Sequence, residues 1–176
     1  MLRVSAFVLF CVLAALAGSA IVPASAQQPA APTAAPPQPP YGPPITLDQA
    51  KRVMGAAELE AAKNSWIVAI TILDSGGNMV MFHKGDNAQL SAITTSAGKA
   101  RTALEFKLPS KALDDAIAAG GAGMRLLALK DITPLQGGNL ILIDGKIAGA
   151  IGVSGALSAQ DDQVAKAGSD VLAKGM

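Results

Sequence analysis

Residues 139–153 read Asn-Leu-Ile-Leu-Ile-Asp-Gly-Lys-Ile-Ala-Gly-Ala-Ile-Gly-Val, and this stretch decides the fold class of the chain. Two apolar runs, 139–143 and 146–153, flank the dipeptide Asp144-Gly145. Asp-Gly suits the positive φ angles of a type I′ turn, so the sequence predicts an antiparallel hairpin. Both runs are apolar on both faces, and such a sheet must be covered on both sides by helices or by another subunit.

A second hairpin is predicted nearer the N-terminus. Residues 66–73 form a continuous apolar, β-branched run, and Ser75-Gly76-Gly77-Asn78 turns the chain into a strand over 79–82. Two hairpins cannot be joined into a doubly wound parallel sheet, so we expect a central antiparallel sheet with helices packed on it. Gly149 and Gly152 in the last strand indicate close approach of a packed helix or of a ligand to the backbone.

Four helices are predicted around these strands. Thr46 and Gln49 form a capping box, which begins a helix that runs to about Asn64. The second and third helices cover about 91–106 and 111–119, and the last helix begins at Ser158. In its first turn, Asp161-Asp162 either stabilises the helix or binds a metal or partner. The predicted order is α-β-β-α-α-β-β-α, in the α/β (α+β) class.

The N-terminal residues 1–26 have the pattern of a cleavable secretory signal. Arg3 precedes an apolar run over 4–16, and the segment ends in Ala24-Ser25-Ala26. An uncleaved membrane anchor is the alternative. With cleavage before Gln27, we expect a periplasmic or secreted protein without stable membrane insertion.

A proline-rich segment follows the predicted signal. Residues 27–44 contain eight prolines among 18 residues, a composition typical of a disordered, extended tether. A ligand for an aromatic-lined groove is the other interpretation. The globular domain is then predicted to cover 45–176.

Composition excludes several kinds of chemistry. Cys11 lies within the predicted signal, so the mature chain has no cysteine for a disulfide, a thiolate metal site or a nucleophile. Removal of Arg3 from the 14 basic residues leaves 13, against 13 acidic residues. A neutral mature chain gives no electrostatic reason to expect binding to nucleic acid or anionic lipid.

The predicted helix 91–106 carries two stripes. The predicted core stripe consists of Ile93, Ala97, Ala100 and Leu104. The opposite stripe has two hydroxyls, a cation and an aromatic ring, namely Thr95, Lys99, Thr102 and Phe106. A phenylalanine on an outer face predicts either a contact with another subunit, in a homo-oligomer, or the wall of a ligand cleft.

His83 is the only histidine, and it follows the second predicted strand. A neutral imidazole binds haem iron well, and Met79 and Met81 lie on the same strand. A solvated polar residue at a strand end is the alternative. With one histidine and three glutamates in the chain, no catalytic triad can be argued.

Four segments resemble the GlcG/HbpS family and occur in the family's order. They are Leu73–Asn78, Gly98–Ala103, Pro134–Gly138, and Asp144–Gly155 followed by Ala159–Asp162. The resemblance covers about 46–174 and implies a profilin-like domain, usually assembled as a homo-oligomer. Its members include an extracellular haem-binding protein, glycolate-operon proteins and the C-terminal domain of PduO-type adenosyltransferases.

The resemblance also implies positions for a haem site. In the haem-binding member a threonine of the Lys-Ala-x-Thr-Ala pattern is linked to iron, and Thr102 matches that pattern. Lys99 or Arg101 is then the expected partner of the haem propionates, with Thr95 on the same stripe. Members with a histidine near the start of the domain have no counterpart here, which leaves His83 as the histidine that could substitute.

Three functions are compatible with these features. The first is an exported haem- or tetrapyrrole-binding module in haem sensing, storage or trafficking. The second is an oligomeric structural or accessory protein without haem. The third is an enzyme, or an accessory to one, acting on a small organic acid such as glycolate, although no catalytic residue is assigned.

Overall fold

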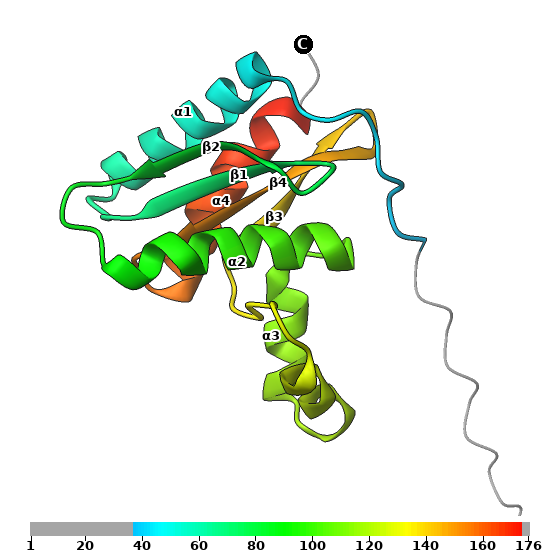
Figure 1. Cartoon of the computed structure of the whole chain (residues 1–176). Coiled ribbons are helices and arrows are strands. Elements are labelled where there is room, and N and C mark those ends of the chain that lie inside the picture. Colours follow the sequence, from blue (N-terminus) through cyan, green and yellow to red (C-terminus); the bar gives the residue numbers. More distant parts are fainter. Residues whose placement is uncertain (1–36, 174–176) are drawn as a thin grey trace, which may run out of the picture. The chain divides into compact units, whose positions relative to one another are not determined.

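A computed structural model of the protein describes residues 37–173 (Figure 1). The predicted signal peptide, most of the predicted tether and residues 174–176 lie outside the described residues. The predicted α-β-β-α-α-β-β-α order is confirmed, with a 3-10 helix, η1, after the third helix. The elements are α1 Leu47–Lys63, β1 Ala69–Asp74, β2 Met79–Lys84, α2 Leu90–Phe106, α3 Ser110–Ala118, η1 Gly121–Ala128, β3 Gly138–Ile143, β4 Lys146–Ser154 and α4 Ser158–Ala173. Among the residues described, no helix combines the length and the hydropathy that crossing a bilayer requires.

The four strands form one sheet in the order β2-β1-β4-β3, and every neighbouring pair is antiparallel. The two predicted hairpins are β1–β2 and β3–β4. Asp144 and Gly145 have φ angles of 49° and 71°, as a type I′ turn requires. The predicted central antiparallel sheet is therefore confirmed.

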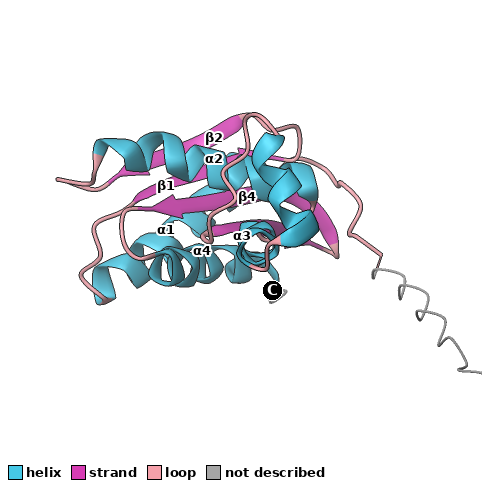
Figure 2. Cartoon of the chain, turned by 90° about the horizontal axis from the view of Figure 1, so that it is seen from below, coloured by secondary structure: helices cyan, strands magenta, loops and turns pink. Residues whose placement is uncertain are grey.

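Helices of the same chain cover both faces of this sheet (Figures 1 and 2). α1 and α4 pack together on one face, over Ile70, Ile72 and Ile151. α2 lies on the other face and packs against Leu73 and Ala150. The apolar character of both sheet faces is thus explained largely by the fold of a single copy.

The predicted core stripe of α2 is confirmed at Ala100 and Leu104, which are buried, but the buried face also includes residues predicted to lie outside it. Ile93, expected in the core, is 38% exposed, whereas Lys99 and Thr102, expected on the outer face, are 2% and 0% exposed. The residues that face the interior are mostly small: Ala92, Ser96, Ala100 and Ala103. They are small because α2 approaches the sheet closely over Gly152, where a Cβ atom would lie 2.0 Å from the Ser96 carbonyl oxygen. Close packing, not side-chain hydrophobicity, decides which face of α2 is buried.

The last residues of the predicted tether contact the domain. The amide of Gly42 donates to Ile147 O at 2.8 Å, and the amide of Ile147 donates to Pro40 O at 2.9 Å. The hydroxyl of Tyr41 donates to Leu104 O, at the C-terminal end of α2, at 2.9 Å. Since Phe106 lies at this same end of α2, the segment 38–42 of the same chain occupies part of the surface that the sequence assigns to a partner subunit.

Candidate functional site

Three of the four segments that resemble the GlcG/HbpS family meet at one buried ion pair between α2 and α4. Lys99 Nζ lies 2.8 Å from Asp161 Oδ2 and donates to Val153 O at 3.0 Å. The two side chains are 2% and 3% exposed. Gly137 packs directly on the pair, since a Cβ atom there would lie 3.0 Å from Lys99 Nζ. These residues belong to three segments that are distant in sequence and meet in the interior of the domain.

Asp161 combines this ion pair with a role at the start of α4. Its Oδ1 accepts a hydrogen bond from the amide of Ala156 at 2.9 Å, just before the helix. Burial raises the pKa of the Asp161 carboxyl, and the hydrogen bonds from Lys99 and Ala156 act in the opposite direction without cancelling the effect. Of the two roles predicted for the Asp161-Asp162 pair, the structure shows stabilisation of the helix start.

Thr102 is also part of the interior. Its Oγ1 accepts a hydrogen bond from the amide of Thr133 at 2.7 Å, and the residue is fully buried. Ser110 acts on the same loop, because its Oγ donates to Leu135 O and accepts from the amide of Gly138. The loop before β3 therefore covers the hydroxyl that the family resemblance links to iron.

Arg101 and Thr95, the other predicted contacts of a propionate, lie apart from these groups. Arg101 is half exposed beside the β1–β2 turn, with its guanidinium 3.4 Å from Gly77 O and 3.5 Å from Glu105 Oε1. Thr95 is half-buried, near the opposite end of α2. The structure thus does not bring the predicted residues together in one site.

His83 stands at the far end of β2 from the β1–β2 turn, about 15 Å along the strand. It lines a pocket of about 200 Å³ where the end of α1 meets β2. The lining residues are mostly apolar: Glu58, Ala61, Ala62, Trp66, Ile67, Val68, Ile70, His83, Gly85 and Asp86. Trp66, predicted in the first strand, instead ends the turn after α1, where its amide donates to Ala61 O.

The imidazole of His83 is held by a carboxylate from α1. Its Nδ1 lies 2.5 Å from Glu58 Oε1, and the two side chains are 51% and 42% exposed. A carboxylate accepts only, so in the neutral imidazole Nδ1 carries the proton and Nε2 keeps its lone pair. Metal-binding histidines are usually oriented by a hydrogen bond of this kind from their other ring nitrogen. His83 therefore has the chemistry of a single axial ligand.

A wider, more open hollow adjoins the His83 pocket. It has a volume of about 470 Å³ and shares Trp66 and Ile67 with that pocket. Ile67 is 51% exposed, and Leu157, which lines the wider hollow, is 71% exposed. The two hollows together give a partly apolar surface on one side of the domain.

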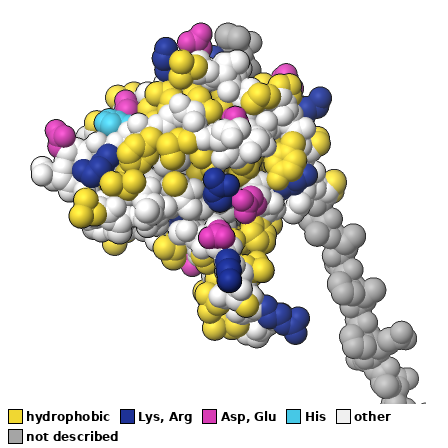
Figure 3. All heavy atoms as spheres, in the orientation of Figure 1, with side chains coloured by type: hydrophobic (Ala, Val, Ile, Leu, Met, Phe, Trp, Pro, Cys, Tyr) yellow, Lys and Arg dark blue, Asp and Glu magenta, His cyan; other side chains and the backbone are white. Residues whose placement is uncertain are grey.

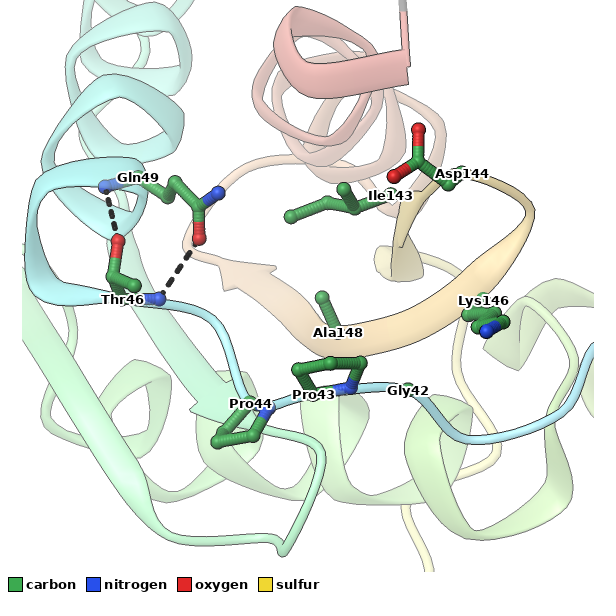
Figure 4. A pocket seen from close by; sticks show the side chains of 9 residues that line it. All are labelled: Gly42, Pro43, Pro44, Thr46, Gln49, Ile143, Asp144, Lys146 and Ala148. Carbon is green, nitrogen blue, oxygen red and sulfur yellow. Dashed lines mark hydrogen bonds between the residues drawn. The ribbon is translucent and has the colours of Figure 1, made fainter.

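Another pocket lies at the beginning of the domain, where the prolines, α1 and the β3–β4 turn meet (Figure 4). Its volume is about 290 Å³. Thr46 and Gln49 exchange hydrogen bonds at its edge, which confirms the predicted capping box. The side-chain amide of Gln49 points into the pocket, across from Ile143 (Figure 4). No imidazole lines this pocket, so the His83 pocket is the better candidate for a metal-containing ligand.

Glu58 is the site residue that sequence reasoning missed. Its contact with His83 spans 25 positions and depends on how α1 packs across β2. Glu58 follows Ala57, which belongs to the buried stripe of α1. The position of the Glu58 carboxylate next to this buried stripe is the one sequence feature that indicates a partner for it.

Comparison with known proteins identifies the family. Residues 45–170 match the family model described as haem degrading protein HbpS-like. This chain belongs to the HbpS-like family. GlcG of Escherichia coli strain K12 is 37% identical over 110 residues, which are 62% of this chain and 81% of GlcG.

Solved structures of the HbpS-like type share the fold. A double mutant of HbpS from Streptomyces reticuli has a TM-score of 0.68 at 30% identity, covering 81% of this chain and 97% of that chain. A crystal structure titled as a PduOC:heme complex has a TM-score of 0.66 at 23% identity, covering 72% of this chain and 94% of that chain. At that identity the second match shows the common fold alone.

Proposed function

We propose that this HbpS-like protein is an exported, homo-oligomeric module that binds haem or a related tetrapyrrole, with the iron bound by His83. The observation that carries the proposal is the His83–Glu58 pair beside an apolar pocket. The family description supports the choice of ligand. Haem supplies an iron that four porphyrin nitrogens already hold, so one imidazole from the protein suffices as an axial ligand.

The residues around His83 fit such a ligand at an open surface. Pockets that enclose small ligands usually have volumes of about 300–1,000 Å³, so the pocket of about 200 Å³ can take one edge of a porphyrin. The neighbouring hollow can accommodate more of the ring, over Trp66 and Ile67. Their apolar surfaces exclude water from one face, while the contact of Glu58 with Nδ1 leaves Nε2 of His83 as the ring nitrogen not engaged by the carboxylate. A half-open site suits sensing, storage or trafficking, in which the ligand must be released.

His83 is favoured over Thr102 as the iron ligand because their accessibility differs. The side chain of His83 is 51% exposed, and Thr102 is fully buried with its oxygen already accepting from Thr133. Lys99 is likewise engaged in the interior by Asp161. A tetrapyrrole at His83 therefore leaves these two residues to their structural contacts.

Spectroscopic titration of the mature domain with haemin tests the proposal. We expect a Soret band for the native protein and a shifted maximum with weaker binding for His83→Ala, because the axial ligand is lost. Glu58→Gln should weaken binding about 10- to 100-fold, as is typical when the group that orients a ligating histidine is replaced. The expected order of effects is His83→Ala, then Glu58→Gln.

Thr102→Val is the matched control, since it removes the hydroxyl and keeps the shape. It should leave the Soret maximum unchanged while lowering the thermal stability, because the partly buried amide of Thr133 loses its acceptor. A spectral change in Thr102→Val with none in His83→Ala would assign the iron to the threonine instead. A native domain that stays colourless would favour the structural or accessory function.

Export is a separate part of the proposal. It rests on the Ala24-Ser25-Ala26 end of the apolar segment, for which cleavage before Gln27 is expected. N-terminal sequencing of protein from the cell envelope and the medium should give Gln27 as the first residue. An intact Met1 in that material would contradict cleavage.

A further inference from the structure

The segment that follows α3 exposes several large apolar side chains. η1 packs mainly on α3, and none of its eight residues is buried. Met124, Leu127 and Leu129 are 48%, 58% and 48% exposed. α3 and η1 project from the body of the domain with apolar side chains along them (Figures 1 and 3). We call residues 110–130 the arm; a cluster of exposed apolar residues of this kind marks an interaction site.

A second exposed apolar surface lies where α2 leaves the sheet uncovered. α2 packs mainly on β1, β4 and β3, and much less on the edge strand β2. Phe82 of β2 pairs with Thr71, and the Thr71 hydroxyl contacts Ser96, one turn after Ile93. Phe82 and the start of α2 therefore lie on the same side of the sheet. The docking face consists of Phe82, Leu90 and Ile93, which are 39%, 82% and 38% exposed.

The arm cannot cover the docking face of its own copy. The docking face adjoins the N-terminal end of α2, and the arm begins just beyond its C-terminal end. A helix of 17 residues separates these ends by about 25 Å. Neither α3 nor η1 packs on β2. Two unpartnered apolar surfaces on one chain that cannot meet within a copy can meet between copies.

Charge favours this pairing of the two surfaces. Between Ala119 and Lys130 the arm has two cations, Arg125 and Lys130, and no carboxylate. The loop that joins β2 to α2 carries Asp86, which is exposed and makes no ion pair with another residue among 37–173. Opposite charges at the rim of a contact speed association and fix its register.

We propose that the arm of one copy docks on the docking face of a second copy, with Arg125 close to Asp86. Each copy then offers one arm and one docking face, so the assembly closes either as a dimer with two reciprocal arms or as a ring. The proposal goes beyond haem binding, because the contact needs no ligand. It also names a surface for the homo-oligomer other than Phe106.

Mixing two variants tests the proposal directly. Leu127→Glu should disable the arm and Phe82→Glu the docking face, each weakening self-association about 30-fold or more, as loss of a central contact does. Alone, each variant should sediment as a monomer at micromolar concentration. A one-to-one mixture should form a dimer, because one variant retains a working docking face and the other a working arm. Leu59→Glu, at a 72% exposed leucine on α1, should keep the native mass.

Other outcomes would overturn the proposal. A native protein that is monomeric, or single variants that keep the native mass, would remove the contact. If one variant alone stays associated while the other is monomeric, arm meets arm or face meets face. Two monomeric variants that stay monomeric when mixed would mean that the arm of one copy does not dock on the docking face of another. If circular dichroism shows that Phe82→Glu is unfolded, Ile93→Glu replaces it. The charge reversals Arg125→Asp and Asp86→Arg should each weaken association, and the two together should restore it. Haemin titration of the monomeric variants shows separately whether they still bind haem.

Discussion

Lys99→Ala is expected to lower the free energy of unfolding by about 3–5 kcal/mol, because it leaves the Asp161 carboxylate buried without its cation. Both side chains are almost completely shielded from water, and Lys99 also donates to Val153 O. The change therefore loosens α2 from β4 and from the start of α4 at once. Urea unfolding followed by circular dichroism measures the effect, and Lys111→Ala serves as the control. Lys111 and Asp115 form an exposed pair, 46% and 64% accessible, whose loss should cost little because water screens their attraction.

The destabilisation by Lys99→Ala should depend on pH. The pKa of Asp161 is raised in the folded protein, so the folded state binds this proton more tightly than the unfolded chain does. The stability that this group contributes is complete below the ordinary aspartate pKa and is lost as pH rises through the raised value. Without Lys99 the pKa rises further, so the variant should lose least stability in mild acid and most at neutral pH. Equal losses for Lys99→Ala and Lys111→Ala would contradict a buried ion pair.

The strands and turns could be predicted because their causes are local. Asp144-Gly145 sets the φ angles of its own turn, and Asp74 does so for the other hairpin by accepting hydrogen bonds from the amides of Gly76 and Asn78. Burial would raise the pKa of Asp74, but these backbone hydrogen bonds and that of Gly77 outweigh it and hold the pKa below its usual value. Residues 73–78 alone therefore contain the features that determine this turn.

Ala100 and Leu104 on the buried face of α2 could be predicted, but the burial of Lys99 and Thr102 could not, because its cause is distant. Lys99 is an exposed residue by type, and its partner Asp161 lies 62 positions further along the chain. The contact of residues 40–42 with β4 likewise depends on where β1 ends in the folded sheet. His83 could be found as the only histidine, but not its partner Glu58. The histidine of the candidate site could therefore be predicted from the sequence, whereas its carboxylate partner is determined by helix packing.

Gly152→Ala is expected to destabilise the domain by about 3 kcal/mol or more, beyond the usual cost of one extra methyl group in a core. The new Cβ atom would lie 2.0 Å from Ser96 O and 2.5 Å from the Ala100 nitrogen. Both are backbone atoms of α2, so no side-chain rotation relieves the clash and the helix must move away from β4. That displacement would also stretch the hydrogen bond from Lys99 to Val153. Gly55→Ala is the matched control, because nothing lies within 4 Å of a Cβ atom at that exposed position in α1. Gly55→Ala should stabilise the domain by about 0.5–1 kcal/mol through helix propensity. Urea unfolding should therefore show changes of opposite sign for the two substitutions. A neutral Gly152→Ala would mean that α2 does not approach the sheet this closely.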